Sequence, residues 1–515
     1  MAFAAPFVRR PGKPPGWLLV AAAIPVVLLL LPLFYVAMRS SEAGWAGIGE
    51  ELLRPRIVDL IVGTLTLGVG VTVATALIGT TAAWLVERCD LPARRALRVA
   101  LCLPLAIPAF VVSYSWSSMS GRFESMWGAI LVLSLSSYPL VYLPVSAAIR
   151  GMNPNLEHVA RSLGSSRWRI FRTVVLPQAL PAIGGGALLV YTHMLAEFGA
   201  LSLLRVQTFT TAIYQSYELQ FDNASAAMQS AVLMLLCFPA VYGEVRLRGK
   251  ARLDAGGRAK RYGVPIALGR LRPLALFGIA MLLLLALGVP IFMLVYWLAH
   301  GTSAGHGLDE VWAALAGSLS LAVPGAFLTA ALALPVVVLS VRFRGVFGRI
   351  AERLPYVVHG LPGLVVALAL IFVSIHYVPA LYQTAPLLLA AYAVLFLPLA
   401  QSAIKASLEL VPVELEQVSR TLGRGPFATF LSVTLPNIAP GLGAATALMA
   451  LELMRELTAT LLLAPTGVTT LATAVWSYTN DTQYAAAAPF AALLVALSVP
   501  PVYLFTRRTF QIYDL

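Results

Sequence analysis

Charged side chains are scarce in this sequence. Asp, Glu, Lys and Arg make up 11% of its 515 residues, whereas hydrophobic residues make up 59% and the mean hydropathy is +0.83. Soluble globular domains are about 25% charged and about 45–50% apolar, and a water-facing surface needs more charge than this chain carries. The composition therefore excludes a soluble globular protein and predicts a chain embedded in a lipid bilayer.

Reactive and metal-binding patterns are also missing. The three cysteines, Cys89, Cys102 and Cys237, are too scattered for a disulfide framework or a metal site. No metal-ligand cluster or nucleophile constellation stands out, so we expect no catalytic residue and no cofactor, and we assign no metal ligand. None of the four lysines stands in a G-x-x-x-x-G-K-[ST] loop. The chain is therefore not expected to hydrolyse ATP itself.

Long apolar runs dominate what is present. A membrane-spanning helix needs about 20 apolar residues, and twelve runs qualify. They lie near residues 17–37, 60–86, 97–118, 127–149, 179–203, 226–243, 274–298, 313–341, 355–375, 384–404, 437–464 and 485–506. The first run is longer than the 7–15 residues of the apolar region of a signal peptide, so we interpret it as a retained spanning helix.

The distribution of Lys and Arg residues between the two sides of the membrane tests the number of predicted helices. If the N-terminus is cytoplasmic and the twelve helices alternate, 30 of the 36 Lys and Arg residues fall on the cytoplasmic side, as the positive-inside rule requires. Both termini are then predicted to be cytoplasmic. The net charge is +13, and the placement of the basic residues on one side of the membrane accounts for it. We therefore expect a lipid bilayer, and no nucleic acid, as a partner.

The sequence contains an internal repeat. Residues 156–177 (LEHVARSLGSSRWRIFRTVVLP) and 415–436 (LEQVSRTLGRGPFATFLSVTLP) match at a constant offset of 259. We predict a first half at 1–244, a basic cytoplasmic linker at 245–272 and a second half at 273–515. Six helices in each half give the two halves one orientation, related by an axis along the membrane normal.

Each copy of the repeated loop reads as two short helices separated by a glycine. Gly164 can end the first helix in the left-handed conformation, and Pro177 can start the next membrane helix without losing a needed donor. A short cytoplasmic helix with an apolar face needs a cover. A groove on a partner protein would supply one, and the alternative is a helix lying on lipid headgroups.

The pattern E-x-x-x-R-x-L-G, six residues, F and then L-P resembles the EAA loop of permeases in binding-protein-dependent ABC importers. Only the first copy keeps an alanine, Ala160, where the family has small residues. The resemblance implies an all-α polytopic membrane protein of type I-like architecture, with about 12 transmembrane helices in two parallel six-helix repeats. It also implies separate ATP-binding ABC subunits, two copies of them, at the cytoplasmic loops, an extracytoplasmic solute-binding protein, and the bacterial cytoplasmic (inner) membrane as location.

The same resemblance implies particular roles for loop residues. ATPase coupling would fall to Glu157, Arg161, Gly164, Glu416, Arg420 and Gly423. The fused two-half build and the stretch ELTATLLLAPTGVTTLATAVWSY at 456–478 are most similar to ferric-iron (Fe³⁺) permeases. Thiamine, phosphonate and polyamine permeases remain alternatives, and so does an ion-driven secondary transporter with two parallel halves.

Charges inside spans are costly and mark functional sites by default. Glu197 and Glu456 are related by the same offset of 259, and we predict that they line the substrate path. Carboxylates suit a hard cation. Glu452, Arg455, His193 and His359 are further candidates, and the alternatives for this group are structural pairing, packing or, for the glutamates, a place near the outer mouth.

Overall fold

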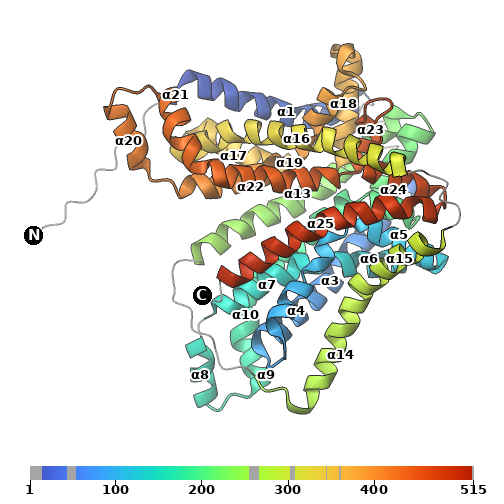
Figure 1. Ribbon diagram of the computed structural model, residues 1–515, viewed down its shortest axis with the longest axis vertical. Helices are drawn as coiled ribbons and strands as arrows, with labels where there is room; N and C mark the ends of the chain where they lie inside the picture. The colour runs from blue at the N-terminus through green and yellow to red at the C-terminus, as the bar shows by residue number, and fades with distance from the viewer. Residues whose placement is uncertain are drawn as a thin grey trace, which may run out of the picture. The chain divides into compact units, whose positions relative to one another are not determined.

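The computed structural model of the chain is almost entirely helical (Figure 1). It describes residues 14–42, 54–152, 154–254, 266–301, 308–343, 345–358 and 361–512. Within these ranges the only extended pairing is an isolated bridge between Cys89 and Ile266. The expected all-α membrane architecture is confirmed.

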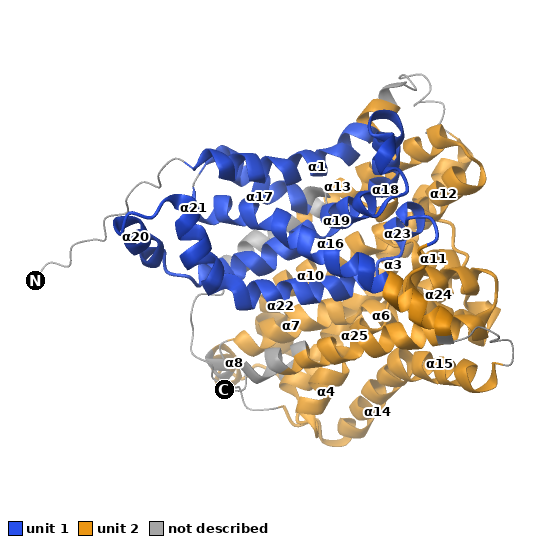
Figure 2. Ribbon diagram, turned by 45° about the horizontal axis from the view of Figure 1, so that its top comes forward, with its two compact units in different colours: residues 1–35, 318–359, 365–467 blue, residues 36–317, 360–364, 468–515 orange. Residues whose placement is uncertain are grey.

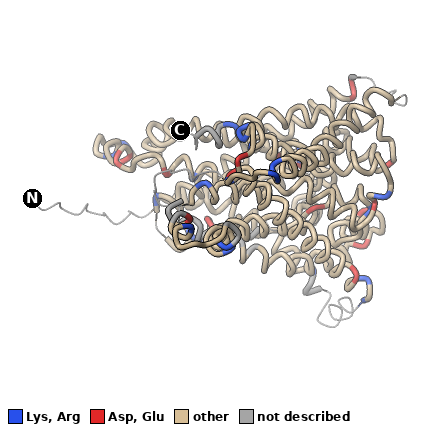
Figure 3. Tube along the Cα trace, turned by 90° about the horizontal axis from the view of Figure 1, so that it is seen from below, with Lys and Arg blue, Asp and Glu red and all other residues tan. Residues whose placement is uncertain are grey.

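Nine helices in the described residues are long and apolar enough to cross a bilayer. They are α1 (Gly16–Glu42), α3 (Pro55–Arg88), α10 (Leu176–Ala196), α13 (Asn223–Asp254), α14 with α15 (Arg272–Leu283 and Val289–His300), α16 (Leu308–Arg342), α19 (Ala385–Glu409), α22 (Leu435–Met454) and α25 (Tyr484–Ile512). Figure 3 shows that most of the tube carries no charged residue. Each of these helices contains an 18-residue window with at most two charged residues, as a lipid-embedded helix requires.

The remaining three predicted spans are broken or short. The run near 97–118 was expected to be one helix, but it bends by 85° between Ala106 and Ala109, because Pro108 lacks the N–H that a continuous helix needs. The run near 127–149 bends by 42° before Pro139. Their pieces are α4 (Arg94–Ala100), α5 (Ala109–Met119), α6 (Met126–Ser137) and α7 (Pro139–Gly151), and the third run is α18 (Gly363–Tyr377).

Short helices connect the spans. They are α11 (Gly199–Leu203), α12 (Phe209–Tyr214), α17 (Val346–Val358), α23 (Thr458–Leu463) and α24 (Leu471–Asn480). α11 and α23 follow α10 and α22 after a break of a few residues, at related places in the two halves.

The chain packs into two compact units (Figure 2). Unit 1 holds residues 1–35, 318–359 and 365–467, and unit 2 holds residues 36–317, 360–364 and 468–515. In unit 1 the start of α1 packs on the second half, with ring centroids 5.4 Å apart for Trp17 and Phe427. In unit 2 the Tyr114 hydroxyl donates to the Tyr484 carbonyl at 2.8 Å. Each packing unit therefore includes helices from both sequence halves, and the division of the repeat at 245–272 stays a prediction.

Inside unit 2, α3 packs closely on α7 at Gly79. A Cβ at this position would lie 2.9 Å from the Tyr138 carbonyl oxygen and 2.9 Å from the Tyr142 nitrogen. Small residues of this kind let two membrane helices approach backbone to backbone. Only glycine fits at this contact.

Part of the predicted linker has a defined structure. α13 continues to Asp254, residues 255–265 lie outside the described residues, and the chain is then held against the loop after α3. Ile266 donates to the Arg88 carbonyl at 2.7 Å, and Leu268 donates to Asp90 Oδ1 at 2.8 Å. That backbone donor stabilises the carboxylate and lowers the pKa of Asp90.

Candidate functional site

The two copies of the repeated loop fold alike. The first copy forms α8 (Pro154–Ser162), α9 (Arg167–Ile170) and a π-helical turn (Phe171–Val175) that leads into α10. The second forms α20 (Val413–Thr421), α21 (Pro426–Thr429) and a π-helical turn (Phe430–Thr434) that leads into α22. Each element begins and ends 259 residues after its counterpart. We refer to α8 and α20 as the loop helices.

A glycine ends each loop helix in the left-handed conformation. The φ angle is +79° at Gly164 and +84° at Gly423. After Gly164, Ser165 donates to the Ala160 carbonyl at 3.1 Å, and Arg424 donates to the Ser419 carbonyl at 3.2 Å in the second copy. This six-residue closure satisfies carbonyls that the helix end leaves free. It also turns the chain sharply toward the next short helix.

A buried ion pair anchors each loop helix to the second span of its own half. Glu157 Oε1 lies 2.6 Å from an Nη atom of Arg88, the last residue of α3. Glu416 Oε1 lies 2.9 Å from Nε of Arg342, the last residue of α16. Neither arginine was among the predicted site residues. They are 254 residues apart rather than 259, so a comparison at constant offset misses them.

Arg342 connects three elements of unit 1. Its guanidinium also donates to the Val411 carbonyl at 3.0 Å and to the Leu408 carbonyl at 3.4 Å, both at the C-terminal end of α19. Thr434, in the π-helical turn, donates to the same Glu416 oxygen at 3.2 Å. A displacement of α20 therefore acts directly on the ends of α16 and α19 and on the start of α22.

The outer face of each loop helix is apolar. Matched positions at the offset of 259 are exposed, and the exposed fractions in the two copies are similar. They are Leu156 (51%) and Leu415 (44%), Val159 (56%) and Val418 (57%), and Leu163 (79%) and Leu422 (75%). We call these six residues the apolar stripe. Arg161 and Arg420 are exposed next to it, so each loop helix presents leucine, valine and a positive charge together.

Aromatic rings hold the segment after each loop helix, but from different spans. Phe171 packs against Trp84 of α3, with ring centroids 4.6 Å apart. Phe430 packs against Trp17 of α1, with ring centroids 6.2 Å apart. The repeat places the two phenylalanines equivalently, whereas their partners are Trp84 of α3 and Trp17 of α1, two different spans that both belong to the first half.

A charged cluster in the first half joins α3, α4 and α7, the helix that leads into α8. Glu87 of α3 accepts hydrogen bonds from Arg98 at 2.8 Å and from the Ser146 hydroxyl at 2.6 Å, and Arg150 Nε lies 3.7 Å away. The glutamate is surrounded by donors. This arrangement compensates a carboxylate that is almost fully buried.

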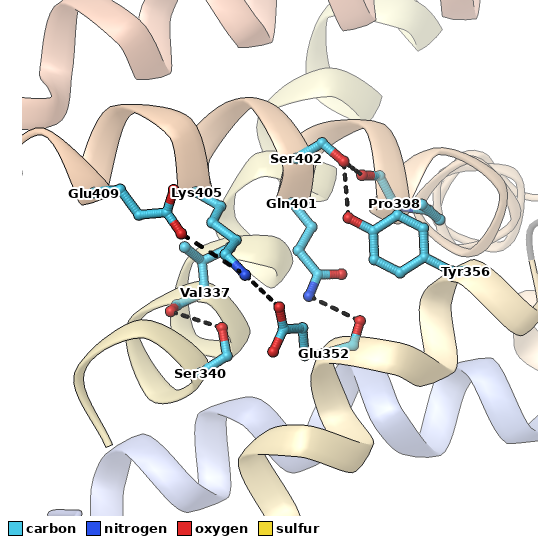
Figure 4. Close-up of polar contacts among 9 residues, drawn as sticks. All are labelled: Val337, Ser340, Glu352, Tyr356, Pro398, Gln401, Ser402, Lys405 and Glu409. Carbon is cyan, nitrogen blue, oxygen red and sulfur yellow. Dashed lines mark hydrogen bonds and ion pairs between the residues drawn. The ribbon is translucent and has the colours of Figure 1, made fainter. Parts of the chain in front are cut away.

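The corresponding cluster in the second half has the opposite signs (Figure 4). Lys405 of α19 lies against the Glu352 carboxylate of α17 and 3.8 Å from Glu409. Lys405 and Glu409 stand 259 residues after Ser146 and Arg150. A carboxylate among bases in one half is thus replaced by an ammonium group among acids in the other.

The two glutamates predicted to line the substrate path act as helix caps. Glu197 Oε1 accepts the Ala200 N–H of α11 at 2.9 Å. Glu456 accepts the N–H groups of Ala459 and Thr460 of α23 at 2.8 and 3.0 Å, and the Thr460 hydroxyl at 2.6 Å. Carboxylates at helix N-termini satisfy donors that have no partner within the helix. Contact of either glutamate with substrate stays a prediction.

Three of the further candidates, His193, Glu452 and Arg455, lie next to these caps in the sequence. His193 Nε2 lies 3.7 Å from Glu197 Oε2, and Arg455 Nη1 lies 3.2 Å from Glu452 Oε1. His359 lies outside the described residues. Among the residues that the structure describes, no group of three or more His, Cys, Asp or Glu side chains is placed to hold a metal ion.

Comparison with known proteins matches this architecture to one family. The model of the "binding-protein-dependent transport system inner membrane component" family matches residues 16–243 and 337–508. The "Fe(3+)-transport system permease protein FbpB 2" of Haemophilus influenzae is 44% identical over 505 residues, which cover 97% of this chain and all of that protein. The sulfate permease protein CysT of Escherichia coli is 28% identical over 40% of this chain and 82% of its own length.

A structural neighbour is a bacterial ABC transporter that imports alginate, with 18% identity and a TM-score of 0.35 over 46% of this chain and 96% of that one. The sequence-based prediction of a transport permease is confirmed by the family match and by the near-complete relative. This chain belongs to the inner membrane components of binding-protein-dependent transport systems, and it carries two stretches that match the family.

Proposed function

We propose that this permease carries ferric iron across the inner membrane, driven by separate ATP-binding subunits that dock on the two loop helices. The solute is inferred from the relative named for Fe(3+) transport, which is 44% identical over nearly the whole chain. Identity of this extent spans both halves, including the regions that would form the pore. A solute-binding protein on the outer side would deliver the iron.

The observation that carries the docking proposal is the apolar stripe on two equivalent helices. Leu163 and Leu422 are the most exposed of the six residues, and covering such apolar side chains with a protein surface is favourable because it removes them from water. A protein groove that takes one loop helix would take the other, because the spacing of the stripe is the same. Two copies of one ATP-binding subunit therefore suit this surface.

Movement of the loop helices would reach the membrane through the buried ion pairs. Closure of the ATP-binding subunits would move α20, and Arg342 connects α20 to α16 and α19. The equivalent route in the first half runs from α8 through Glu157 and Arg88 to α3. Binding energy that differs between the open and closed subunits would thereby shift the permease between two conformations.

The orientation follows from the same proposal. The loop helices face the cytoplasm, and the N- and C-termini lie on the same side, as the distribution of basic residues predicts. Glu197 and Glu456 remain our candidates for the substrate path. They are to be tested separately from the loop helices.

The test is ATP-driven uptake of ferric iron into vesicles that contain the permease and its ATP-binding subunit. Leu163→Ser and Leu422→Ser together remove one large apolar side chain from each loop helix. Burial of a leucine is worth about 1.5–3 kcal/mol, so we expect affinity for the ATP-binding subunit to fall by about 10- to 100-fold for each helix, with loss of uptake.

Leu271→Ser is the matched control, because Leu271 is also exposed (61%) but lies outside both loops. Sulfate, the solute in the name of the 28% identical relative, is the competing solute. Uptake of sulfate in place of iron would reject the proposed solute and leave the docking proposal intact. Unchanged subunit affinity in the double variant would reject the docking proposal itself.

A further inference from the structure

One face of α17 is fixed against α19 (Figure 4). The Tyr356 hydroxyl lies 2.8 Å from the Ser402 hydroxyl, and Gln401 Nε2 donates to the Glu352 carbonyl at 3.2 Å. The Glu352 carboxylate pairs with Lys405 on the same side. On α17 these contacts are made by Glu352 and Tyr356, which lie one turn apart on the same side of the helix, so they fix which side of α17 faces outward.

The outward face combines positive charge with apolar surface. Val346, Arg349, Ile350 and Arg353 follow the i, i+3, i+4, i+7 spacing of one helical face, and all four are exposed. With Leu354 they line an open hollow of about 460 Å³, within the range of sites for small ligands, about 300–1,000 Å³. The one acidic residue of α17, Glu352, is already paired on the inner side.

The two arginines have no ion-pair partner among the residues that the structure describes. Arg349 and Arg353 are four residues apart on one helix, so their Cβ atoms lie about 5–6 Å from each other. Both guanidinium groups can therefore reach a single anion. Arginine binds phosphate oxygens through paired N–H donors. This arrangement is suited to a phosphate group rather than to a neutral ligand.

The short helix at the related place in the first half has no such free pair. In α4, Arg94 donates to the Cys89 carbonyl, and Arg98 is buried and bonded to Glu87 at 2.8 Å. Internal partners therefore satisfy both of these arginines. In the part of the chain that the structure describes, the pair of α17 is therefore not matched by Arg94 and Arg98 of α4.

The position of α17 indicates which phosphate it meets. It begins four residues after Arg342, the end of the spanning helix α16, and it is followed by the apolar helix α18. A basic amphipathic helix between two apolar helices lies at the level of the lipid headgroups. The exposed Val346 and Ile350 side chains share the face of α17 that carries the two arginines, so a lipid held by the arginines could place an acyl chain against them.

We propose that the outer face of α17 binds an anionic phospholipid, with Arg349 and Arg353 holding its phosphodiester and Val346 and Ile350 contacting its acyl chain. The lipid would fill the hollow and brace α17 against the bilayer. Since α17 is tied to α19, and α19 leads into the loop helix α20, the bound lipid would support the helix that leads to the proposed docking site.

The test is native mass spectrometry of the full-length permease in detergent, titrated with phosphatidylglycerol or with phosphatidylcholine of the same acyl chains. An arginine near anionic headgroups contributes about 1 kcal/mol, so Arg349→Gln with Arg353→Gln is expected to weaken phosphatidylglycerol binding by about 30-fold. Arg349→Lys with Arg353→Lys keeps the charges and is expected to retain most of the binding.

The control is Arg270→Gln with Arg272→Gln, which removes two exposed arginines at the start of another spanning segment. This control variant is expected to bind phosphatidylglycerol as the wild type does. Equal phosphatidylglycerol binding by the α17 glutamine variant and the wild type would overturn the proposal, as would equal binding of phosphatidylcholine by the wild type.

Two further measurements distinguish a lipid from other occupants of the α17 face, namely a soluble phosphate or a partner protein. Glycerol phosphate at millimolar concentration is expected not to displace the lipid, because it lacks the acyl chain; displacement would show a site for a soluble phosphate and overturn the lipid proposal. If the glutamine variant keeps phosphatidylglycerol but no longer captures the ATP-binding subunit, α17 is a protein-docking surface and the lipid proposal is likewise overturned.

Discussion

Glu416 and Arg342 form a buried ion pair, with Oε1 and Nε 2.9 Å apart, between a loop helix and the end of a membrane helix. The pair of Glu157 and Arg88 occupies the related place in the first half, at 2.6 Å. A glutamate that the sequence pattern marks for coupling is therefore first of all an attachment point. Its partner decides which spanning helix responds when the loop helix moves.

Glu416→Ala is expected to destabilise the permease and to uncouple it. Removal of one partner of a buried ion pair leaves an unpaired charge, at a cost of about 3–5 kcal/mol. We expect a lower thermal midpoint in detergent and loss of ATP-driven uptake. Glu414→Ala is the matched control, because Glu414 is exposed and lies two residues earlier in the same helix. A normal midpoint with lost subunit docking would instead mean that Glu416 contacts the ATP-binding subunit directly.

Gly423→Ala is expected to cost about 1–2 kcal/mol, because an alanine strains the left-handed conformation at φ +84°. The space around the missing Cβ is open, so any effect comes from the backbone alone. Gly425→Ala is the control, since Gly425 has open space around it and φ of −67°. Chemical denaturation of the two variants checks the difference. Equal stability would show that the helix end adapts without the left-handed turn.

The inverted clusters allow a charge exchange. Lys405→Glu alone is expected to destabilise the protein, because it places a third carboxylate near Glu352 and Glu409. Lys405→Glu combined with Glu352→Lys restores an opposite-charge pair, and we expect a coupling energy of about 1–3 kcal/mol in a double-mutant cycle. Thermal midpoints of the four proteins give this value. Additive effects would mean that the contact contributes nothing to stability.

Glu456→Gln distinguishes a cap from a substrate ligand. As a cap, Glu456 accepts from two N–H groups and a hydroxyl, and an amide would leave a donor unpaired at a cost of about 1–3 kcal/mol. We expect a lower thermal midpoint with an unchanged KM for iron. Glu452→Gln, at a side chain that is 46% exposed, is the control. A raised KM at an unchanged midpoint would place Glu456 in the substrate path.

The sequence by itself determined the spanning runs, the repeat at an offset of 259 and the glycine turns at Gly164 and Gly423. These features depend on neighbours within a few residues: apolar length, helix-end chemistry and spacing along one helix. The break at Pro108 also has a local cause, but an apolar run of sufficient length conceals it.

Only the tertiary structure decided which residues meet. Arg88 and Arg342 are ordinary ends of spanning helices in the sequence, and their ion pairs with Glu157 and Glu416 form only when distant segments pack together. The capping role of Glu197 and Glu456 requires a break in the helix at that residue. The free arginines of α17 are recognised only once the partners of Glu352 are known. Burial and pairing are long-range quantities, set by contacts between residues far apart in the chain, and no local pattern encodes them.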